Sequence, residues 1–425
     1  MNLQEIKALH DIYCMSSDVV IDSRKIQPKS LFFALKGANV DGNEFALQAI
    51  AKGAIAAVVD NPSLKDESNC FYVQDVLSAL QQLSQYHRNT FSFPVIGLTG
   101  SNGKTTTKEL IRDVLAKKYD VQATSGNLNN HIGVPLTILA SRMPLDFLIV
   151  EMGANHQGEI DFLSRIAQPD FGLITNIGKA HLEGFGGPEG VKKGKSELYR
   201  HLAQSRKTIF VNGEDLVLDG LIPEGYTNVI EYYPNKMMKV IKTHPTLSLI
   251  LDQFQIDSHL FGHYNLFNIA AAVCIGLYFH VPAKAIAQAV SEYIPENNRS
   301  QIINWYSNTI IRDAYNANPS SMQYSIENFA KSDFKNKILI IGDMYELGEF
   351  TEEEHRKILE LVSKEEWLMC MFVGNYFYEC RNGYPYLFFK TLEEAKTSFL
   401  EKNIEHSAIL LKGSRGIALE KLLES

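Results

Sequence analysis

The segment from residue 94 to residue 119 constrains the fold of this chain more than any other. It runs from the apolar sequence PVIGLT through the glycine-rich turn TGSNGKTT into the helical pattern TTTKELIRDVLAKKY. An apolar strand that passes through a tight turn into a helix is the first half of a β-α-β unit, whose helix returns the chain to a parallel neighbouring strand. The sequence therefore predicts a parallel, helix-covered sheet around this segment.

Two later apolar runs extend the predicted sheet. DFLIVEMG, residues 146–153, and FGLITNIG, residues 171–178, are almost continuously apolar, which is typical of parallel strands that are covered on both faces. Each run ends in a polar loop that contains glycine. Since ligands of open α/β sheets bind at the carboxyl ends of the strands, we expect a functional site where these loops meet the glycine-rich turn.

The rest of the chain divides into further α/β regions. Residues 1–90 alternate short apolar strands with helices, and the helical pattern of residues 76–89 ends just before Pro94. Residues 224–262 alternate like a β-rich insertion, and the polar segment 294–301 has the composition of a linker. The length suits three domains. We expect a small N-terminal α/β domain (1–90), a central parallel-sheet domain with the β-rich insertion (91–297), and a C-terminal Rossmann-like α/β domain (298–425).

Composition excludes several classes of protein. A formal net charge of −8 leaves no excess of basic residues for nucleic acid. The five cysteines are scattered without C-x-x-C spacing, which suits a reducing compartment. No apolar run approaches the roughly 18 residues of a membrane span, and the N-terminus lacks the regions of a signal peptide. We therefore expect a cytoplasmic monomer with no nucleic-acid partner and no membrane span.

The glycine-rich turn has the residues that a phosphate-binding loop needs. They are Gly100, Ser101, Asn102, Gly103, Lys104, Thr105 and Thr106. Glycines let backbone N–H groups turn towards phosphate oxygens, the helix N-terminus adds its dipole, Lys104 offsets charge and Thr105 can hold magnesium. Leu98 replaces the first glycine of the strict G-x-x-x-x-G-K-[ST] pattern. A plain strand-to-helix turn is the alternative, but the flanking elements favour a nucleotide loop, and we expect ATP.

Three further residues are candidate site residues because of their predicted positions relative to the strands of the sheet. Glu151 ends an apolar strand and could complete a magnesium site with Thr105, although it could instead cap the following turn. His181 follows the next strand and is alternatively a solvated loop histidine. Lys195 lies on a helix expected to begin near Gly190 and to pass beneath the same crevice. From composition alone Lys195 is a surface lysine.

Ordered motifs along nearly the whole chain resemble one family, the Mur ligases. They are DSR (22–24), LFFALKGANVDGNEF (31–45), LTGSNGKTTTKE (98–109), GNLNNHIGVPLT (126–137), EMGANHQGEI (151–160), HLEGFG (181–186), GHYNLFNIAAA (262–272), DAYNANPSSM (313–322), GDMYELG (342–348) and KGSRG (412–416). Three of them, GANHQGEI, DAYNANPSSM and GDMYELG, resemble the branch that adds D-alanyl-D-alanine to UDP-N-acetylmuramoyl tripeptide. The resemblance therefore implies these two substrates, together with ATP and Mg²⁺.

The resemblance also implies a role for residues of the central region. It places the ATP phosphates at Gly100 to Thr106, and Mg²⁺ at Thr105, Glu151 and His181. Lys195 resembles the family's carbamylated lysine, whose N-carboxylate helps to place a second Mg²⁺. Asn129 and Asn130, with His131, resemble a loop that lines the substrate.

The remaining implied roles fall outside that set. Asn268 resembles the asparagine beside the adenine, Arg299 the linker arginine that reaches the γ-phosphate, and Asp313 the carboxylate that takes the ribose hydroxyls. Family members often have two aspartates there, whereas this chain has Arg312-Asp313. Ser23 and Arg24, with Asp41-Gly42, resemble the region for the uridine diphosphate. Ordinary turns and caps are the alternative for the polar residues of the first domain and the substrate loop. Dipeptide or carboxylate binding competes with surface charge for Lys412, Ser414 and Arg415.

The implied reaction activates the terminal carboxylate of the tripeptide as an acyl phosphate, which the amine of the dipeptide then attacks. Lys104, His181, Lys195 and Arg299 are the expected catalytic residues, and closure of the central on the third domain is expected to complete the site. The alternatives are another Mur-type amino acid ligase, a folylpolyglutamate synthetase, or a regulatory module that binds ATP without forming a bond. A regulatory module has no need of Glu151, His181 and Lys195.

Overall fold

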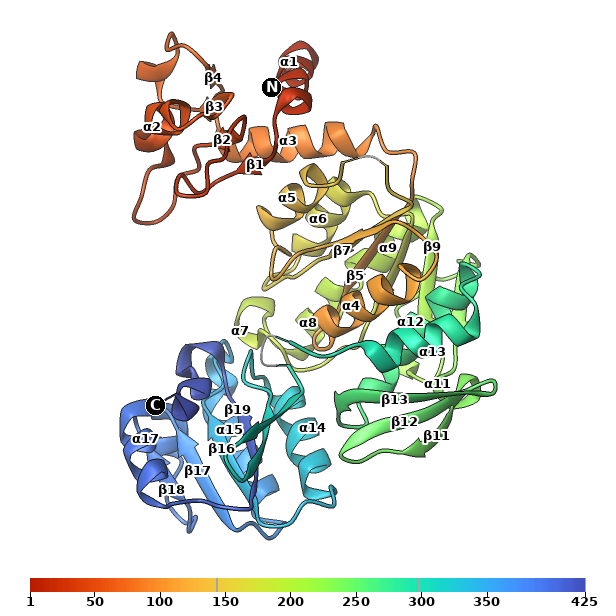
Figure 1. Ribbon diagram of the computed structural model, residues 1–425, viewed down its shortest axis with the longest axis vertical. Coiled ribbons are helices and arrows are strands. Elements are labelled where there is room, and N and C mark those ends of the chain that lie inside the picture. The colour runs from red at the N-terminus through yellow and green to blue at the C-terminus, as the bar shows by residue number, and fades with distance from the viewer. Residues whose placement is uncertain (143, 297–298, 425) are drawn as a thin grey trace.

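This computed structural model describes residues 1–142, 144–296 and 299–424. Three α/β regions follow one another along the long axis of the molecule, with the N-terminus in the first and the C-terminus in the third (Figure 1). The prediction of a three-domain α/β fold is confirmed. The expected boundary at residues 90 and 91 falls between the end of one helix at Arg88 and the start of a strand at Val95. The expected boundary at residues 297 and 298 lies outside the described residues.

The N-terminal region is a four-stranded parallel sheet in the order β1-β2-β3-β4. Its strands are β1 (Val19–Val20), β2 (Leu31–Phe33), β3 (Ala56–Val59) and β4 (Cys70–Tyr72). Its helices are α1 (Leu3–Met15), η1 (Gly42–Phe45), α2 (Ala46–Ala51), η2 (Pro62–Leu64) and α3 (Val76–Arg88). Asp75 begins α3 because its carboxylate accepts a hydrogen bond from the backbone N–H of Ser78 at 2.6 Å. In Figure 1 α3 lies between this sheet and the central region.

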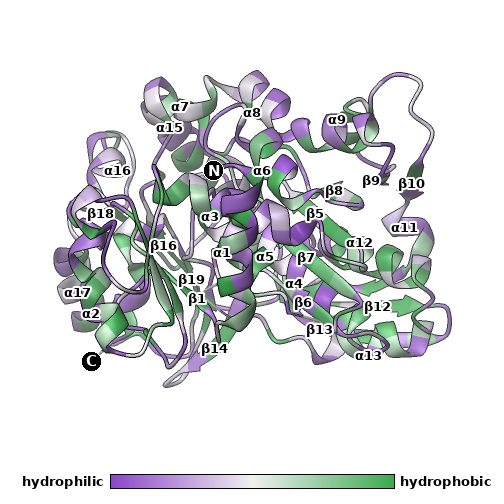
Figure 2. Ribbon diagram, turned by 90° about the horizontal axis from the view of Figure 1, so that it is seen from above, coloured by the Kyte–Doolittle hydropathy of each residue, from purple (hydrophilic) through white to green (hydrophobic). Residues whose placement is uncertain are grey.

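The central region is built on a six-stranded parallel sheet in the order β10-β9-β8-β5-β7-β6. Its strands are β5 (Val95–Thr99), β6 (Val121–Ala123), β7 (Phe147–Glu151), β8 (Phe171–Ile174), β9 (Thr208–Asn212) and β10 (Val229–Tyr232). Along β7, Leu148 and Val150 belong to one core cluster and Phe147 and Ile149 to another. Both faces of the strand are therefore buried, which explains its continuous apolar run. Figure 2 shows β5 and β7 as largely hydrophobic.

Helices cover both faces of the central sheet. One face is covered by α4 (Lys104–Leu115), α12 (Asn265–Tyr278) and α13 (Ala283–Glu292), and the other by α5 (Gly133–Leu139), α6 (Glu159–Ala167), α8 (Pro188–Lys195) and α9 (Glu197–Gln204). Three short helices complete the region: α7 (Leu182–Phe185), α10 (Leu216–Asp219) and α11 (Pro234–Met237).

The expected β-rich insertion is shorter than predicted. It is a three-stranded antiparallel sheet of β11 (Lys239–Lys242), β12 (Thr246–Leu251) and β13 (Phe254–Phe261). Residues 229–232 form β10 at the edge of the central sheet, parallel to β9, so their assignment to the insertion was wrong. An edge strand is only partly buried, and its sequence VIEY therefore resembles the half-exposed strands of an insertion.

The C-terminal region has a six-stranded sheet in the order β14-β15-β19-β16-β17-β18, in which β14 is antiparallel to β15 and the other pairs are parallel. Its strands are β14 (Gln301–Trp305), β15 (Asn308–Arg312), β16 (Lys337–Gly342), β17 (Met369–Val373), β18 (Leu387–Phe389) and β19 (Ala408–Lys412). Its helices are α14 (Pro319–Ala330), η3 (Gly348–Phe350), α15 (Thr351–Val362), α16 (Asn375–Glu379), α17 (Leu392–Glu401), η4 (Arg415–Ile417) and η5 (Leu419–Leu423). In the described residues we find no helix whose length and apolarity would let it cross a membrane.

Candidate active site

The glycine-rich turn connects β5 to α4, and two of its glycines are required by their surroundings. Gly100 has a φ of 145° and Gly103 a φ of 77°, which are values that residues with a side chain rarely adopt. A Cβ atom at Gly100 would lie 2.0 Å from the hydroxyl of Thr175, and one at Gly103 would lie 2.5 Å from the side-chain oxygen of Asn268. The turn can therefore pack against β8 and α12 only because these positions lack side chains.

The loop that follows β8 holds the turn in place. The backbone N–H of Ser101 donates to the carbonyl of Asn176 at 3.0 Å, and that of Asn102 donates to the Asn176 side chain at 3.0 Å. Lys104 donates from its ammonium to the carbonyls of Gly100 at 2.8 Å and Ser101 at 3.1 Å. Burial lowers the pKa of Lys104 to about 8, although Glu151 opposes the shift. The ammonium therefore lies inside the turn, at the position where a cation would meet phosphate oxygens.

Glu151 is the last residue of β7, and its carboxylate reaches the first turn of α4. One oxygen accepts from the hydroxyl of Thr105 at 2.9 Å and the other from the side-chain amide of Asn129 at 2.8 Å. The ammonium of Lys108 lies 3.9 Å from the same carboxylate. The register that pairs β7 with β5 brings these groups together. Two hard oxygen donors, from Thr105 and Glu151, thus lie side by side beside the phosphate turn, as a magnesium site needs.

Lys195 is the last residue of α8 and is not a surface lysine. Its side chain is 1% exposed, and its ammonium donates to the carbonyl of Ala154 at 3.2 Å and lies 5.2 Å from the centre of the Phe185 ring. Burial lowers the pKa of Lys195 well below its usual value, and Lys104 lowers it further. More distant carboxylates, those of Glu159, Glu197 and Glu151, only partly oppose the shift, and none of the ion pairs found among the described residues includes Lys195. A buried amine without an anionic partner is disposed to be neutral, which is the form that reacts with carbon dioxide.

His181 follows β8 and contacts the C-terminal region. Its φ is 53°, and its ring nitrogen Nδ1 bonds the carboxylate of Glu346. Among the described residues no three histidine, cysteine, aspartate or glutamate side chains cluster tightly enough to hold a metal ion. A cation here would therefore depend on Thr105, phosphate oxygens, water and any N-carboxylate of Lys195 as well as on Glu151 and His181.

One cavity of about 1480 Å³ lies between the central and C-terminal regions and opens towards the substrate loop. This is larger than the roughly 300–1,000 Å³ of a site for one small molecule. Sequence-predicted residues that line it are Ser101, Asn102, Gly103, Lys104, Thr106, Asn129, Asn130, Glu151, His181, Asn268, Arg299 and Asp313. Lys195 lies behind the wall, since Ala154, to which it donates, lines the cavity. The cavity therefore has room for a nucleotide together with a second ligand.

Two predicted substrate residues lie elsewhere. Ser23 and Arg24 belong to the N-terminal region and do not line the cavity. The side chain of Arg24 is 87% exposed and pairs with Asp22 at 2.8 Å, and the carbonyl of Ser23 accepts from Lys52 at 3.1 Å. Asn130 lines the cavity, and its side-chain oxygen also accepts from the backbone N–H groups of Ile132 at 3.1 Å and Gly133 at 2.9 Å in the turn before α5.

Of the nucleotide residues predicted beyond the turn, Asn268 lies on α12 beside the turn, whereas Arg299 and Asp313 lie on the wall of the cavity that the C-terminal region forms. Asn268 accepts from the Thr107 hydroxyl at 3.1 Å. The guanidinium of Arg299 stacks on the ring of Tyr315 at 3.8 Å. Asp313 accepts from the ammonium of Lys412 at 2.7 Å.

Sequence reasoning missed several residues of this wall. Lys412 was weighed as a dipeptide ligand or a surface charge, yet its side chain is 2% exposed in an ion pair with Asp313. Asn318 begins α14 and donates from its side chain to that of Asn102 at 2.7 Å. The Asn318-Pro319 pair is a helix-start signal that could have located α14. No sequence signal showed that Asn318 and Glu346 would meet residues of the central region, or that Lys412 would pair with Asp313.

Comparison with known proteins gives one family for all three regions. The model of the Mur ligase middle domain matches residues 98–276, that of the Mur ligase family catalytic domain residues 17–88, and that of the Mur ligase glutamate ligase domain residues 298–415. The UDP-N-acetylmuramoyl-tripeptide--D-alanyl-D-alanine ligase of Bacillus subtilis is 36% identical over 82% of this chain and 78% of its own. That of Haemophilus influenzae is 31% identical over 99% and 96%.

Solved structures agree with these matches. MurF from Acinetobacter baumannii is 30% identical, with a TM-score of 0.87 over 99% of this chain and 97% of its own. The MurF ligase from Thermotoga maritima in complex with ADP is 26% identical, with a TM-score of 0.84 over 97% of each chain. A folylpolyglutamate synthase from Mycobacterium tuberculosis is 14% identical, with a TM-score of 0.63 over 82% of this chain, and shares the fold alone. The chain therefore belongs to the Mur ligase family.

Proposed function

We propose that this protein is the ATP-dependent ligase that joins D-alanyl-D-alanine to UDP-N-acetylmuramoyl tripeptide and so supplies the pentapeptide precursor of peptidoglycan. One observation carries the proposal: a phosphate-binding turn, the carboxylate of Glu151, and the basic side chains of Arg299, Lys331 and Lys412 from the C-terminal region line a single cavity. The relatives that bear this name cover up to 99% of the chain. The UDP-linked substrate named for these relatives supports a reaction in the cytoplasm, and the proposed roles are all assigned to residues of one chain, which supports a monomer.

The turn supports binding of the ATP phosphates. Lys104 already donates to two carbonyls of the turn, and phosphate oxygens would replace these weaker acceptors. Asn268 lies under Gly103, which suits an adenine or ribose beside α12. The carboxylate of Asp313, which already accepts from Lys412, would also accept hydrogen bonds from the ribose hydroxyls. The ADP in the Thermotoga maritima relative supports a nucleotide in the same fold.

The residues present also fit Mg²⁺ and a carbamylated lysine. Thr105 and Glu151 supply oxygens, His181 supplies an imidazole whose other nitrogen bonds a carboxylate, and Lys195 supplies a buried amine. When bound, Mg²⁺ neutralises charge on the phosphoryl group that is transferred. Carbamylation would turn the Lys195 amine into an anionic oxygen donor near Lys104.

The proposed reaction has two displacements. An oxygen of the tripeptide carboxylate attacks the γ-phosphorus, the bond to the β-phosphate oxygen breaks, and ADP leaves with an acyl phosphate behind. The amine of the dipeptide then attacks the acyl carbon, and the tetrahedral intermediate expels phosphate and loses a proton to give the amide. Lys104 and Arg299 would hold the charge that spreads over the transferred group. Enclosure between two regions would keep water from the acyl phosphate.

Mass spectrometry of the products tests this proposal. Purified protein with ATP, Mg²⁺, UDP-muramoyl tripeptide and D-alanyl-D-alanine is expected to give the muramoyl pentapeptide, ADP and phosphate. Diaminopimelate, lysine and glutamate, offered with the muramoyl precursors or with folate as acceptors, distinguish other Mur-type ligases and a folylpolyglutamate synthetase. ATP binding with no amide product from any combination would instead favour a regulatory module and would defeat the proposal.

A further inference from the structure

The loop after β8 is held by the C-terminal region at several points. The backbone N–H of Lys179 donates to the Ser320 hydroxyl at 2.9 Å, and its ammonium donates to the Glu354 carboxylate at 2.6 Å. The backbone N–H of Glu183 donates to the carbonyl of Glu346 at 3.1 Å. The contact between these two regions is therefore made by backbone groups and by an ion pair that do not involve a ring nitrogen.

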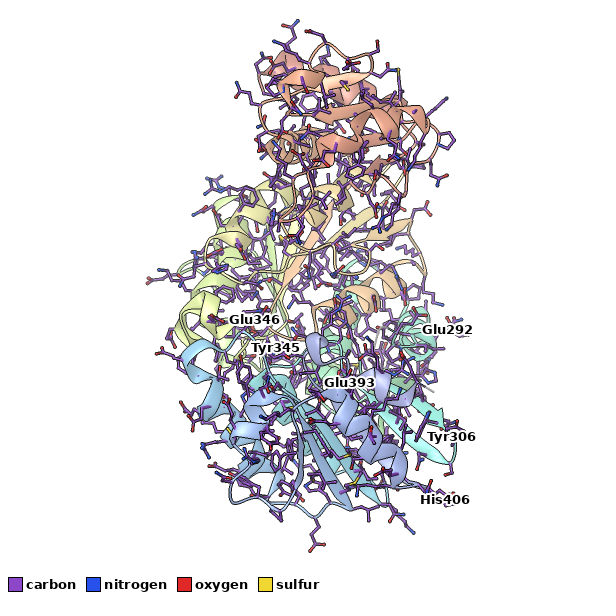
Figure 3. All side chains as sticks on the ribbon, turned by 90° about the vertical axis from the view of Figure 1, so that its left-hand side faces the viewer. Glu292, Tyr306, Tyr345, Glu346, Glu393 and His406 are labelled. Carbon is purple, nitrogen blue, oxygen red and sulfur yellow. The ribbon has the colours of Figure 1, made fainter. Side chains whose placement is uncertain are left out.

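His181 lies in the same loop and makes a separate contact. Its Nδ1 bonds the Glu346 carboxylate, and its ring lines the cavity. Both residues have a positive φ, 53° for His181 and 62° for Glu346, which non-glycine residues adopt only where the surroundings require it. Figure 3 shows Glu346 with Tyr345 at the edge of the C-terminal region that faces the central region. The two backbones are thus bent so that an imidazole and a carboxylate meet across the boundary.

The contact between His181 and Glu346 contributes little to docking. Their side chains are 20% and 53% exposed, and at such exposure even fully charged pairs add little stability. Docking is already provided by the Glu346 carbonyl, by the Lys179 contacts and by Leu347, which is buried. The carboxylate of Glu346 therefore does something other than hold the two regions together.

We propose that Glu346 is a positioning residue supplied by the C-terminal region, and that its carboxylate fixes the His181 ring with the proton on Nδ1. A neutral imidazole has one protonated and one free nitrogen, so this bond leaves the lone pair on Nε2 for a cation. Carboxylates that bond the distant nitrogen of a ligand histidine orient the ring in this way in metal sites. The cation site is then complete only when the C-terminal region docks. The inference rests on the proposed function only in taking a divalent cation as the ligand of Nε2.

The first measurement uses metal-free protein and therefore does not depend on catalysis. Histidine labelled with ¹⁵N, with His181 assigned from the His181→Gln variant, reports which ring nitrogen carries the proton. The wild-type protein is expected to hold His181 with Nδ1 protonated, and Glu346→Ala to shift the ring towards the tautomer with Nε2 protonated. A wild-type ring protonated mainly on Nε2, or a ring unchanged in Glu346→Ala, would overturn the proposal.

The second measurement follows the cation. Mn²⁺ binding in the presence of ADP, and the Mg²⁺ concentration for half-maximal turnover, are expected to weaken about 10- to 100-fold in Glu346→Ala, the scale reported for losing such a partner. The KM for ATP at saturating Mg²⁺ should change less than threefold. Glu346→Gln, which keeps an acceptor oxygen, is expected to recover most of the affinity.

Lys179→Met is the matched control because it removes an ion pair between the same loop and the same region without touching His181. It is expected to keep wild-type Mn²⁺ affinity within twofold. Equal weakening in Lys179→Met and Glu346→Ala would show that docking alone matters and would refute the positioning role. If the wild-type protein forms no amide at all, the proposed function fails, whereas the ring tautomer and the Mn²⁺ affinity still decide the role of Glu346.

Discussion

The central region contacts its two neighbours in different ways. Towards the N-terminal region, side chains donate to backbone carbonyls: Arg88 of α3 donates to the carbonyls of Ala167 at 2.9 Å and Gln168 at 2.7 Å, and Tyr13 of α1 donates to that of Leu139 at 2.7 Å. Towards the C-terminal region, backbone contacts are joined by pairs of polar side chains, as in the Asn102–Asn318 contact of 2.7 Å and the Lys179–Glu354 ion pair of 2.6 Å. Gln81 of α3 reaches the cavity at the first interface, but Arg88 and Tyr13 do not line it, whereas Asn102 and Asn318 of the second interface both do.

The difference shows which interface is suited to movement. Carbonyls at the end of α6 have no partner within the helix and are costly to leave buried and unpaired, so separating α3 from them would be expensive. Several side chains at the second interface, among them Asn102, Lys179 and Glu346, are partly exposed and can exchange a protein partner for water at small cost. Closure and opening are therefore expected between the central and C-terminal regions, with the N-terminal region moving as one body with the central region.

The largest expected effect is a loss of turnover on replacement of Lys195, which lies behind the wall of the cavity. Lys195→Ala is expected to reduce kcat by about 10³-fold, the scale of losing one group that stabilises transferred charge, because the N-carboxylate could no longer form. The free energy of unfolding should change by less than about 2 kcal/mol, since removing a desolvated ammonium offsets the loss of packing. Steady-state kinetics and urea unfolding measure the two quantities.

The exposed lysine of the same helix is the control for that variant. Lys193 also lies on α8 and its side chain is exposed, so Lys193→Ala should keep both turnover and stability near wild type. Short-chain carboxylic acids are expected to restore part of the activity of Lys195→Ala by occupying the vacated space. Wild-type turnover of Lys195→Ala without added acid would end the case for a carbamylated lysine.

The opposite pattern is expected at the N-terminal interface. Arg88→Met should lower the free energy of unfolding by about 3 kcal/mol, because it leaves two buried carbonyls unpaired and breaks the 2.8 Å ion pair with Asp170. The kcat of the folded variant should stay within twofold. Gln85→Ala removes one exposed bond to the carbonyl of Arg165 from the same helix and should cost less than about 1 kcal/mol. A fall in kcat with unchanged stability would show instead that the first interface takes part in the reaction cycle.

The sequence predicted the parts of the fold that depend on local pattern. The P-loop strand and helix, the buried strand ending at Glu151 and the loop at His181 all follow from apolar runs and glycine turns, since each signal lies within a few residues. The β-rich insertion was placed too early because the partly buried edge strand β10 has the same local pattern as an exposed hairpin. The spacing of apolar residues indicates which side chains of a strand are buried. It does not indicate which sheet the strand joins.

Contacts between distant segments could not be read from the sequence. Lys195 looked like a surface residue, yet the packing of α8 beneath the Glu151–Glu159 loop buries it. Lys412 on β19 and Asp313 just after β15 are almost a hundred residues apart, and only the strand order of the C-terminal sheet makes them neighbours. The resemblance to the family supplied the roles of Lys195 and Asp313, and these roles remain predictions.

The smallest expected effect concerns the pH dependence of nucleotide binding at the second interface. Burial lowers the pKa of Lys104 to about 8, so in the free protein the amine loses its charge as pH rises through that value. Since phosphate binds the protonated form, the affinity for ADP without Mg²⁺ should be constant near pH 7 and should fall towards tenfold per pH unit above 8. The phosphate itself ionises near pH 6 and adds nothing in this window.

Lys104→Arg, whose guanidinium stays charged, should abolish the fall, as calorimetry from pH 6.5 to 9.5 can measure. An ADP affinity that is independent of pH in the wild-type protein would mean that Lys104 keeps its proton over this pH range despite its burial. The surroundings of its ammonium would then be as polar as the partly exposed interface that the turn faces.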